Sequence, residues 1–214
     1  SLTQIEVRDG TTQICTSAFS NANITSITIP NSVTEIGGGV FYNCTALKSI
    51  VFSTNMNSLP CYKYSDYGTF YQGFFQNCSS LKSITIPNSI VEIGDLAFEG
   101  CTSLVSIEIP NSVTEIGGGV FAGCKSLKTI KLSENIKTLN TVNYFGSYGF
   151  FEECTSLESI AIPNSVTEIG TDAFNGCSSL TSIEIPNSVI YLGDMALANC
   201  HSLRYAKLGK GFRV

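Results

Sequence analysis

One 23-residue unit, L-x-S-I-x-I-P-N-S-V-T-E-I-G-x-x-A-F-x-G-C-x-S, recurs along this chain of 214 residues and constrains its fold more than any other feature. A fixed period of this length is typical of a solenoid, in which each unit buries its apolar face only against its neighbours. The anchor positions of successive units are Leu2, Ile24, Leu47, Leu81, Leu104, Leu127, Leu157, Leu180 and Leu203. The spacing predicts a single solenoid over residues 1–214, with about nine turns and cut within a repeat at both ends.

Each unit reads as one short strand followed by turns. In the unit that starts at Leu104, Ile107 and Ile109 alternate with polar residues, as in a strand with one buried face. Pro110 ends the strand because proline cannot donate to a sheet ladder. The spacing of Phe121 and Cys124 indicates a short helical, 3-10 or irregular turn on the convex side. Stacked units therefore predict a curved solenoid with a parallel β-sheet on its concave face.

Cysteine and phenylalanine recur at fixed places in the unit, which indicates two buried columns. Seven of the nine cysteines are in register, namely Cys44, Cys78, Cys101, Cys124, Cys154, Cys177 and Cys200. A column of identical positions defines no unique disulfide pairing, so we interpret these thiols as reduced core residues. Cys15 and Cys61 are off register, and Cys61 lies in an insertion, so it is the thiol expected to react with reagents in solution.

The sequence I-P-N-S-V-T-E-I-G followed by A-F-x-x-C resembles the BspA-like, Treponema pallidum-type leucine-rich repeat. The resemblance covers the whole chain and implies a right-handed curved solenoid. It also implies a surface protein of host-associated bacteria or parasitic protists, with adhesion and binding to host proteins as the recurring roles. It implies no catalytic residue.

Composition and motifs argue against several functions. Charged residues make up 14% of the chain, against about 25% in an average protein, and the net charge is −5, so we expect no nucleic-acid partner. No apolar run reaches the length of a membrane span, so no direct membrane insertion is expected. With a single histidine, His201, and no catalytic or metal-binding motif, we predict no enzyme, no cofactor and no metal.

Two units are longer than the rest, with insertions near residues 60–70 and 140–146. Their aromatic residues are Tyr62, Tyr64, Tyr67, Phe70, Tyr71, Phe74, Tyr144, Phe145, Tyr148 and Phe150. Three turns of about 4.8 Å would place the insertions about 14 Å apart on one edge of the solenoid. Tyrosine offers a large, rigid contact surface with a hydroxyl group, so Tyr62, Tyr64, Tyr67, Tyr71, Tyr144 and Tyr148 are candidate ligand-binding residues. The alternative is that these rings pack on one another and cover the sheet edge.

The concave face is the second candidate surface. One outward-facing position of the strand varies between units and carries Glu108, Lys131, Glu184 and Lys207 among its residues. Selection by a ligand and neutral drift both produce such variation. A separate stripe of glutamates, Glu35, Glu92, Glu115 and Glu168, is interpreted as a solvated face.

The leading hypothesis is a non-catalytic binding or adhesion module, at the cell surface or secreted, that recognises a protein or glycan ligand from a host. One alternative is a structural spacer that presents another domain. Another is a surface-layer segment that associates weakly end to end, because open solenoid ends expose strand edges.

Overall fold

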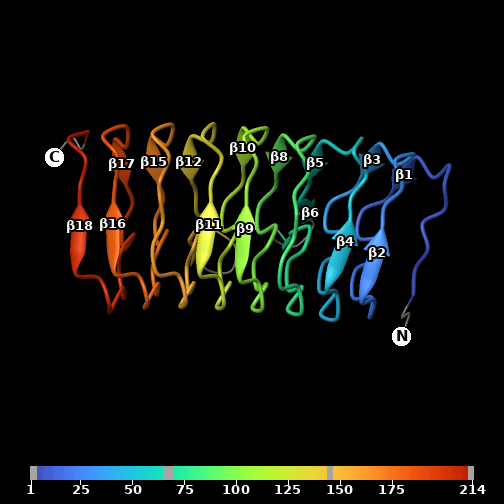
Figure 1. The fold of residues 1–214 in the computed structure, drawn as a ribbon, viewed down its shortest axis with the longest axis horizontal. Coiled ribbons are helices and arrows are strands. Elements are labelled where there is room, and N and C mark those ends of the chain that lie inside the picture. The colour runs from blue at the N-terminus through green and yellow to red at the C-terminus, as the bar shows by residue number, and fades with distance from the viewer. Residues whose placement is uncertain (1–3, 65–69, 144–146, 212–214) are drawn as a thin grey trace.

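The chain forms a solenoid whose turns lie side by side in one row, with the two termini at opposite ends (Figure 1). This computed structural model describes residues 4–64, 70–143 and 147–211. The side chains at the repeated apolar positions form one hydrophobic core that runs through the described turns. The predicted repeat solenoid with parallel β-sheets is therefore confirmed.

The predicted strand forms in most of the described units and pairs in parallel with that of a neighbouring unit, and these strands are called here the front ladder. Its strands are β2 (Ser26–Thr28), β4 (Ser49–Val51), β9 (Ser106–Glu108), β11 (Thr129–Lys131), β16 (Ser182–Glu184) and β18 (Tyr205–Lys207). They pair in parallel as β2–β4, β9–β11 and β16–β18. Single bridges from Ser83 to Ser106 and from Ala161 to Glu184 extend the β9–β11 and β16–β18 pairs by one turn each.

A second parallel ladder runs alongside, formed by short strands where the sequence analysis expects turns. Its two-residue strands are β1 (Gln13–Ile14), β3 (Glu35–Ile36), β5 (Ser58–Leu59), β8 (Glu92–Ile93), β10 (Glu115–Ile116), β12 (Thr138–Leu139), β15 (Glu168–Ile169) and β17 (Tyr191–Leu192). Glu92 pairs with Glu115 in register, and both side chains are exposed, so the acidic stripe is a solvated column as predicted.

Turns complete each unit, and none of the described residues is helical. The amide of Cys124 donates to the carbonyl of Phe121 at 3.1 Å, and the same turn recurs from unit to unit. Of the three predicted forms the irregular one is observed. The predicted phenylalanine column is confirmed: rings of Phe98 and Phe121 stack with centroids 5.6 Å apart and an interplanar angle of 4°.

The seven in-register cysteines are free thiols inside the core or at its margin. Each donates a weak hydrogen bond to the phenylalanine carbonyl of the preceding turn, as from Cys124 Sγ to Phe98 O at 3.1 Å. Burial raises the pKa of these thiols, to about 11 for Cys44 at the edge of the column. Core packing by reduced cysteine is therefore confirmed.

The structure argues against the reactivity predicted for Cys61. Its thiol is half-buried, and burial, with the Asp95 carboxylate as a smaller contribution, raises its pKa to about 12. Cys15 is the exposed free thiol among the described residues. Because the thiolate is the reactive species, Cys15 and not Cys61 should react first with reagents in solution.

Candidate ligand-binding surfaces

Both insertions form antiparallel hairpins at the same corner of the solenoid. In hairpin 1, β6 (Tyr62–Tyr64) pairs with β7 (Phe70–Gln72), and in hairpin 2, β13 (Val142–Asn143) pairs with β14 (Ser147–Tyr148). Each hairpin leaves the end of a second-ladder strand, β5 or β12, and returns into the phenylalanine column. Two of the candidate tyrosines, Tyr67 and Tyr144, lie outside the described residues.

Each hairpin rests on a triglycine corner in the preceding turn. A Cβ atom added to Gly118 would lie 2.7 Å from the carbonyl carbon of Thr141, and one on Gly119 would lie 3.0 Å from Tyr148 Cβ. For hairpin 1, a Cβ on Gly39 would lie 2.7 Å from Gln72 Cβ. The absence of side chains at Gly38, Gly39, Gly118 and Gly119 is thus what allows the hairpins to pack closely, whereas Gly37 and Gly117 lie against the turn that precedes them.

Backbone conformation alone does not demand these glycines. The third corner residue has φ 62° at Gly39 and Gly119, but φ 56° is also observed at Leu96 and Met195 in turns that no hairpin covers. The triglycine corners therefore occur in the turns against which a hairpin packs. Sequence analysis missed this role, although the signal was present: triglycine occurs only in the turn before each insertion.

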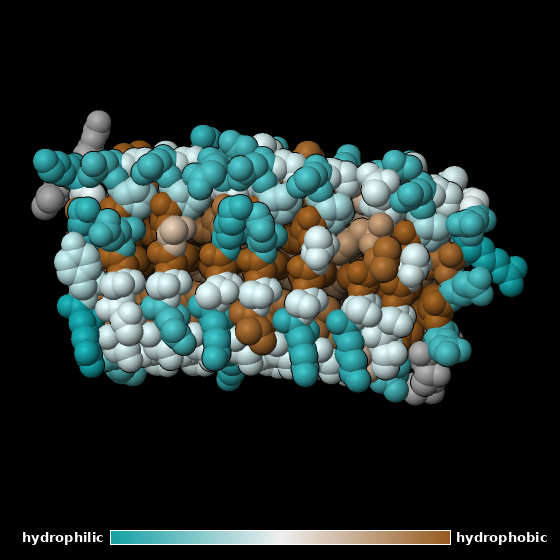
Figure 2. All heavy atoms as spheres, in the orientation of Figure 1, coloured by the Kyte–Doolittle hydropathy of each residue, from teal (hydrophilic) through white to brown (hydrophobic). Residues whose placement is uncertain are grey.

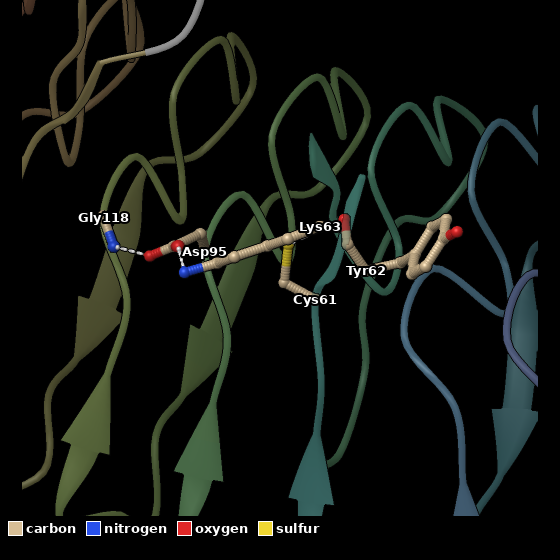
Figure 3. A network of polar contacts seen from close by, with 5 residues as sticks. All are labelled: Cys61, Tyr62, Lys63, Asp95 and Gly118. Atoms are coloured by element: carbon tan, nitrogen blue, oxygen red, sulfur yellow. Dashed lines mark hydrogen bonds and ion pairs between the residues drawn. The ribbon is translucent and has the colours of Figure 1, made fainter. Parts of the chain in front are cut away.

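A polar network ties hairpin 1 to the corner beneath hairpin 2 (Figure 3). The ammonium of Lys63 lies 3.0 Å from Asp95 Oδ2 and 5.1 Å from the centre of the Tyr71 ring. The other oxygen of Asp95 accepts a hydrogen bond from the amide of Gly118 at 2.8 Å. The hydrogen bond to Asp95 raises the pKa of Lys63. Neither Lys63 nor Asp95 was among the residues predicted from the sequence.

The aromatic rings of the insertions divide into a projecting and a buried set. Tyr64 and Phe70 face each other across hairpin 1, and each is 42% exposed. The Tyr62 ring lies 6.4 Å from that of Tyr64, on the side of hairpin 1 away from the Lys63–Asp95 pair (Figure 3). Tyr71 and Tyr148 are half-buried, and burial raises the pKa of Tyr148.

Two aromatic residues counted with the insertions belong to the core instead. Phe74 and Phe150 are fully buried, and each packs edge-on against the next phenylalanine of the column at 4.8 Å. They follow the hairpins in sequence but lie where the chain re-enters the solenoid. For these two rings the packing alternative is correct.

On the front ladder, the four predicted charged residues meet as two ion pairs between neighbouring strands. Lys131 Nζ lies 2.6 Å from Glu108 Oε1, and Lys207 Nζ lies 3.1 Å from Glu184 Oε2. These hydrogen bonds raise the pKa of both lysines. All four side chains are more than half exposed, so the pairs contribute little to stability.

Within the described ranges, no three His, Cys, Asp or Glu side chains are arranged to hold a metal ion. None of the described segments is a helix of the length and apolarity that a membrane crossing requires. The prediction that the chain is not an enzyme remains an expectation.

Comparison with known proteins identifies the repeat. The sequence profile described as "BspA type Leucine rich repeat region" matches residues 1–72, 68–148 and 143–214. No curated protein matches the chain. Among solved structures, the leucine-rich repeat protein of Treponema pallidum is 30% identical, with a TM-score of 0.65 over 81% of this chain and 74% of that one.

Two further structures share the fold. A leucine-rich repeat protein from Bacteroides ovatus is 27% identical, with a TM-score of 0.64 over 92% of this chain and 58% of that one. A leucine-rich cell surface protein from Faecalibacterium prausnitzii is 22% identical, with a TM-score of 0.55 over 92% of this chain and 83% of that one.

Proposed function

The chain belongs to the BspA-type leucine-rich repeat family, and on that premise we propose that it is a non-catalytic module that binds a host protein at a cell surface or after secretion. The proposed location agrees with the printed description of the Faecalibacterium prausnitzii relative as a cell surface protein. Repeats of this family supply scaffold and contact surface but no shared catalytic residue. We place the contact surface on the two hairpins.

The observation that carries this proposal is the construction of the hairpins. Both hairpins arise at the same corner and pack against a triglycine corner of the preceding turn. Hairpin 1 also presents the exposed Tyr64–Phe70 pair. Exposed aromatic rings on a rigid support bury large areas on binding and lose little conformational entropy. Tyr64 and Phe70 lie opposite each other in the hairpin, so together they offer one aromatic surface to a ligand.

The Lys63–Asp95–Gly118 network supports the same proposal. It fixes the base of hairpin 1 to the next two turns, which include the corner that carries hairpin 2. A contact surface held in its bound geometry loses less freedom when the ligand arrives, and so binds more tightly. The ion pair is exposed on the lysine side, so its value is in orientation more than in stability.

The experiment compares binding of a panel of immobilised host extracellular matrix proteins to the wild type and to a Tyr64→Ser/Phe70→Ser variant. We expect the affinity for at least one matrix protein to fall tenfold or more in the variant. Tyr205→Ser is the matched control, because Tyr205 is 52% exposed on the front ladder, away from both hairpins. Equal binding by the Tyr64/Phe70 variant, with its fold intact, would contradict the proposal.

A glycan ligand is the main alternative occupant of the hairpins. A glycan array decides between the two classes of ligand. If the protein binds an array glycan through Tyr64 and Phe70 and binds no matrix protein, the ligand of the hairpins is a glycan and not a protein. The structural spacer is favoured by the near identity of the turns, since PNSVTEIGGGVF occurs at both 30–41 and 110–121. Failure of well-folded protein to bind either panel supports the spacer.

Self-association is favoured by a different observation. Exposed large apolar side chains gather in the turns between residues 190 and 208, namely Ile190, Tyr191, Met195, Tyr205 and Leu208. Weak association through these turns would raise the apparent mass with protein concentration. A mass that stays monomeric across the concentrations used for binding dismisses this alternative.

A further inference from the structure

The edge at which the front-ladder strands begin carries a row of lysines, called here the lysine edge. It is the lower edge of the molecule in Figure 2, where hydrophilic side chains recur along the solenoid. Four successive turns reach this edge, with residues 45–49, 79–83, 102–106 and 125–129. These segments contain no aspartate or glutamate, and their cationic residues are Lys48, Lys82, Lys125 and Lys128. All four lysines are exposed.

Backbone hydrogen bonds hold three of these turns in register. The amide of Val105 donates to the carbonyl of Lys82 at 3.0 Å, and the amide of Lys128 donates to the carbonyl of Val105 at 2.9 Å. Neighbouring turns are about 4.8 Å apart, so the backbone positions of Lys82 and Lys128 are about 9.6 Å apart, with Val105 between them. The lysine positions therefore follow the solenoid axis in a straight row.

The lysine edge differs from other lysines of the front ladder because it has no acidic partner. Lys131 and Lys207 each contact a glutamate of the preceding turn, at 2.6 Å and 3.1 Å. Within the described ranges, no lysine of the edge forms an ion pair with a carboxylate. Like charges in neighbouring turns repel one another, and an anion that lies between them is attracted by both.

The acidic residues that recur in the repeat lie on the other ladder. Glu92 and Glu115 are exposed in β8 and β10, at the upper edge of the view in Figure 1. The net charge of −5 is thus unevenly distributed, with the lysine edge opposite the glutamate column. A narrow anionic chain can follow the lysines along one edge without meeting the glutamates, whereas a broad anionic surface would approach both.

We propose that the lysine edge binds a linear sulfated polysaccharide of the glycosaminoglycan class, with its chain along the solenoid axis. Such a chain repeats its anionic groups with each disaccharide, and a disaccharide is about as long as the two turns from Lys82 to Lys128. Ser83 and Thr129 are exposed directly after these lysines, and their hydroxyl groups can donate to sulfate oxygens or accept from sugar hydroxyls. Both the ligand and the surface differ from those proposed for the hairpins.

A sulfated glycan suits this edge better than a nucleic acid. Single-stranded nucleic acids stack their bases on aromatic side chains, and the four segments contain no aromatic residue. Arginine is the residue that recognises a phosphate with two hydrogen bonds, and the cations of the edge are all lysines. The negative net charge also opposes the wide contact that a duplex makes.

The test measures binding of the full chain to immobilised heparin over a series of NaCl concentrations. We expect binding at low salt that weakens steeply as salt rises, because the lysines displace the counterions of the polyanion. Heparin from which the sulfate groups have been removed should not bind. Absence of binding to heparin at low salt, or equal binding of the desulfated chain, would overturn the proposal.

Charge-neutral variants locate the binding. Lys82→Gln/Lys128→Gln should lower the affinity for heparin about tenfold and make its salt dependence shallower. Lys137→Gln/Lys210→Gln is the matched control, because it removes the same charge from two exposed lysines outside the edge. The control should bind heparin as the wild type does. Equal losses in the two variants would show attraction by overall charge and refute the site.

A variant that gains charge gives the opposite readout. Val105 is 43% exposed in the gap of the row, so Val105→Lys should fold normally and raise the affinity for heparin about threefold. Unchanged or weaker binding by this variant would contradict a chain that runs along the row.

Two further arms separate this proposal from its alternatives. Tyr64→Ser/Phe70→Ser should leave heparin binding unchanged, so the lysine edge and the hairpins can fail independently. Single-stranded DNA and polyglutamate serve as competitors, and neither should displace heparin at an equal concentration of charge. Displacement by one of them would assign the edge to that polyanion and refute the glycan.

Discussion

At the residue scale, identical residues in successive turns perform different tasks. The asparagine after the strand proline is the clearest case. Asn111 accepts the amide of Glu134 because the next turn has Ser133 in place of proline, and Ser133 Oγ donates to the carbonyl of Val113 at 2.6 Å. Asn88 precedes a turn that keeps Pro110, and its amide stays available. The difference is set by the following turn, not by the asparagine itself.

A stability comparison tests this distinction. Asn111→Ala should lower the free energy of unfolding by about 1 kcal/mol, because it leaves the amide of Glu134 without its partner. For a chain of this length that corresponds to a fall of about 2–4 °C in melting temperature. Asn88→Ala, the matched control, should leave the melting temperature unchanged. Equal losses for the two variants would show that the hydrogen bond contributes nothing.

The buried thiols predict a loss of stability in alkaline solution. Burial raises the pKa of Cys44 from 9.0 to about 11 and that of Cys101, Cys124 and Cys154 well above 9.0. Above pH 9 the unfolded chain therefore loses thiol protons that the folded chain retains, so stability present below pH 9 is lost as the pH rises toward the folded values. Each such thiol contributes up to about 1.4 kcal/mol per pH unit.

Urea unfolding under reducing conditions measures this effect. The midpoint should be stable below pH 9 and fall steeply between pH 9 and 11. Cys101→Ala, although less stable at neutral pH because it removes a buried side chain, should show a shallower fall. A midpoint that does not change up to pH 11 would contradict the assignment of these thiols to the folded core.

At the scale of the element, the corner of each turn decides whether a hairpin can pack on the turn. The corner residue of positive φ is glycine under a hairpin and a larger residue elsewhere, such as Met195, which is 58% exposed. The corner thus has the same backbone conformation in every such turn, but it carries either glycine or a larger side chain. A hairpin can pack only on a corner that carries glycine.

Exchanging the two kinds of corner tests this account. Gly119→Met places a side chain against Tyr148 Cβ and Val142 Cγ1, each 3.0 Å from the new Cβ, and should destabilise the fold by about 1–3 kcal/mol. It should also speed hydrogen exchange at Val142 and Tyr148. Met195→Gly, in contrast, relieves a positive φ and should stabilise the fold by up to about 1 kcal/mol. If hydrogen exchange at Val142 and Tyr148 stays slow in the Gly119→Met variant, hairpin 2 does not need glycine at this corner.

Sequence reasoning predicts the periodic elements and fails where the period breaks. The front ladder and the buried phenylalanine and cysteine columns follow from residues that recur every turn, so their faces are readable from spacing. The second ladder is harder to predict because its strands, such as Glu115–Ile116, are two residues long and show no alternation. The hairpin form of the insertions and the Lys63–Asp95 link depend on contacts between turns, which no single unit contains.

At the scale of the whole molecule, the solenoid is a regular support with two hairpins at one corner. The hairpins are three turns apart, because the chain repeats at the level of three units as well as one. Regular packing gives the support its stability, and departures from regularity provide the surfaces that can discriminate between ligands. The central claim is that recognition of the protein ligand belongs to the hairpins and stability to the repeat.

Excision of hairpin 1 tests that claim most directly. Replacing residues 60–74 by Gly-Asp-Leu-Ala converts this turn to the length of the turn that contains Gly94–Ala97, which folds without a hairpin. The measurement is the affinity of the wild type and of this variant for the matrix protein captured by the wild type, with circular dichroism as the control for folding. The account predicts a folded solenoid that has lost at least tenfold in affinity. A folded variant that binds as tightly as the wild type would contradict it.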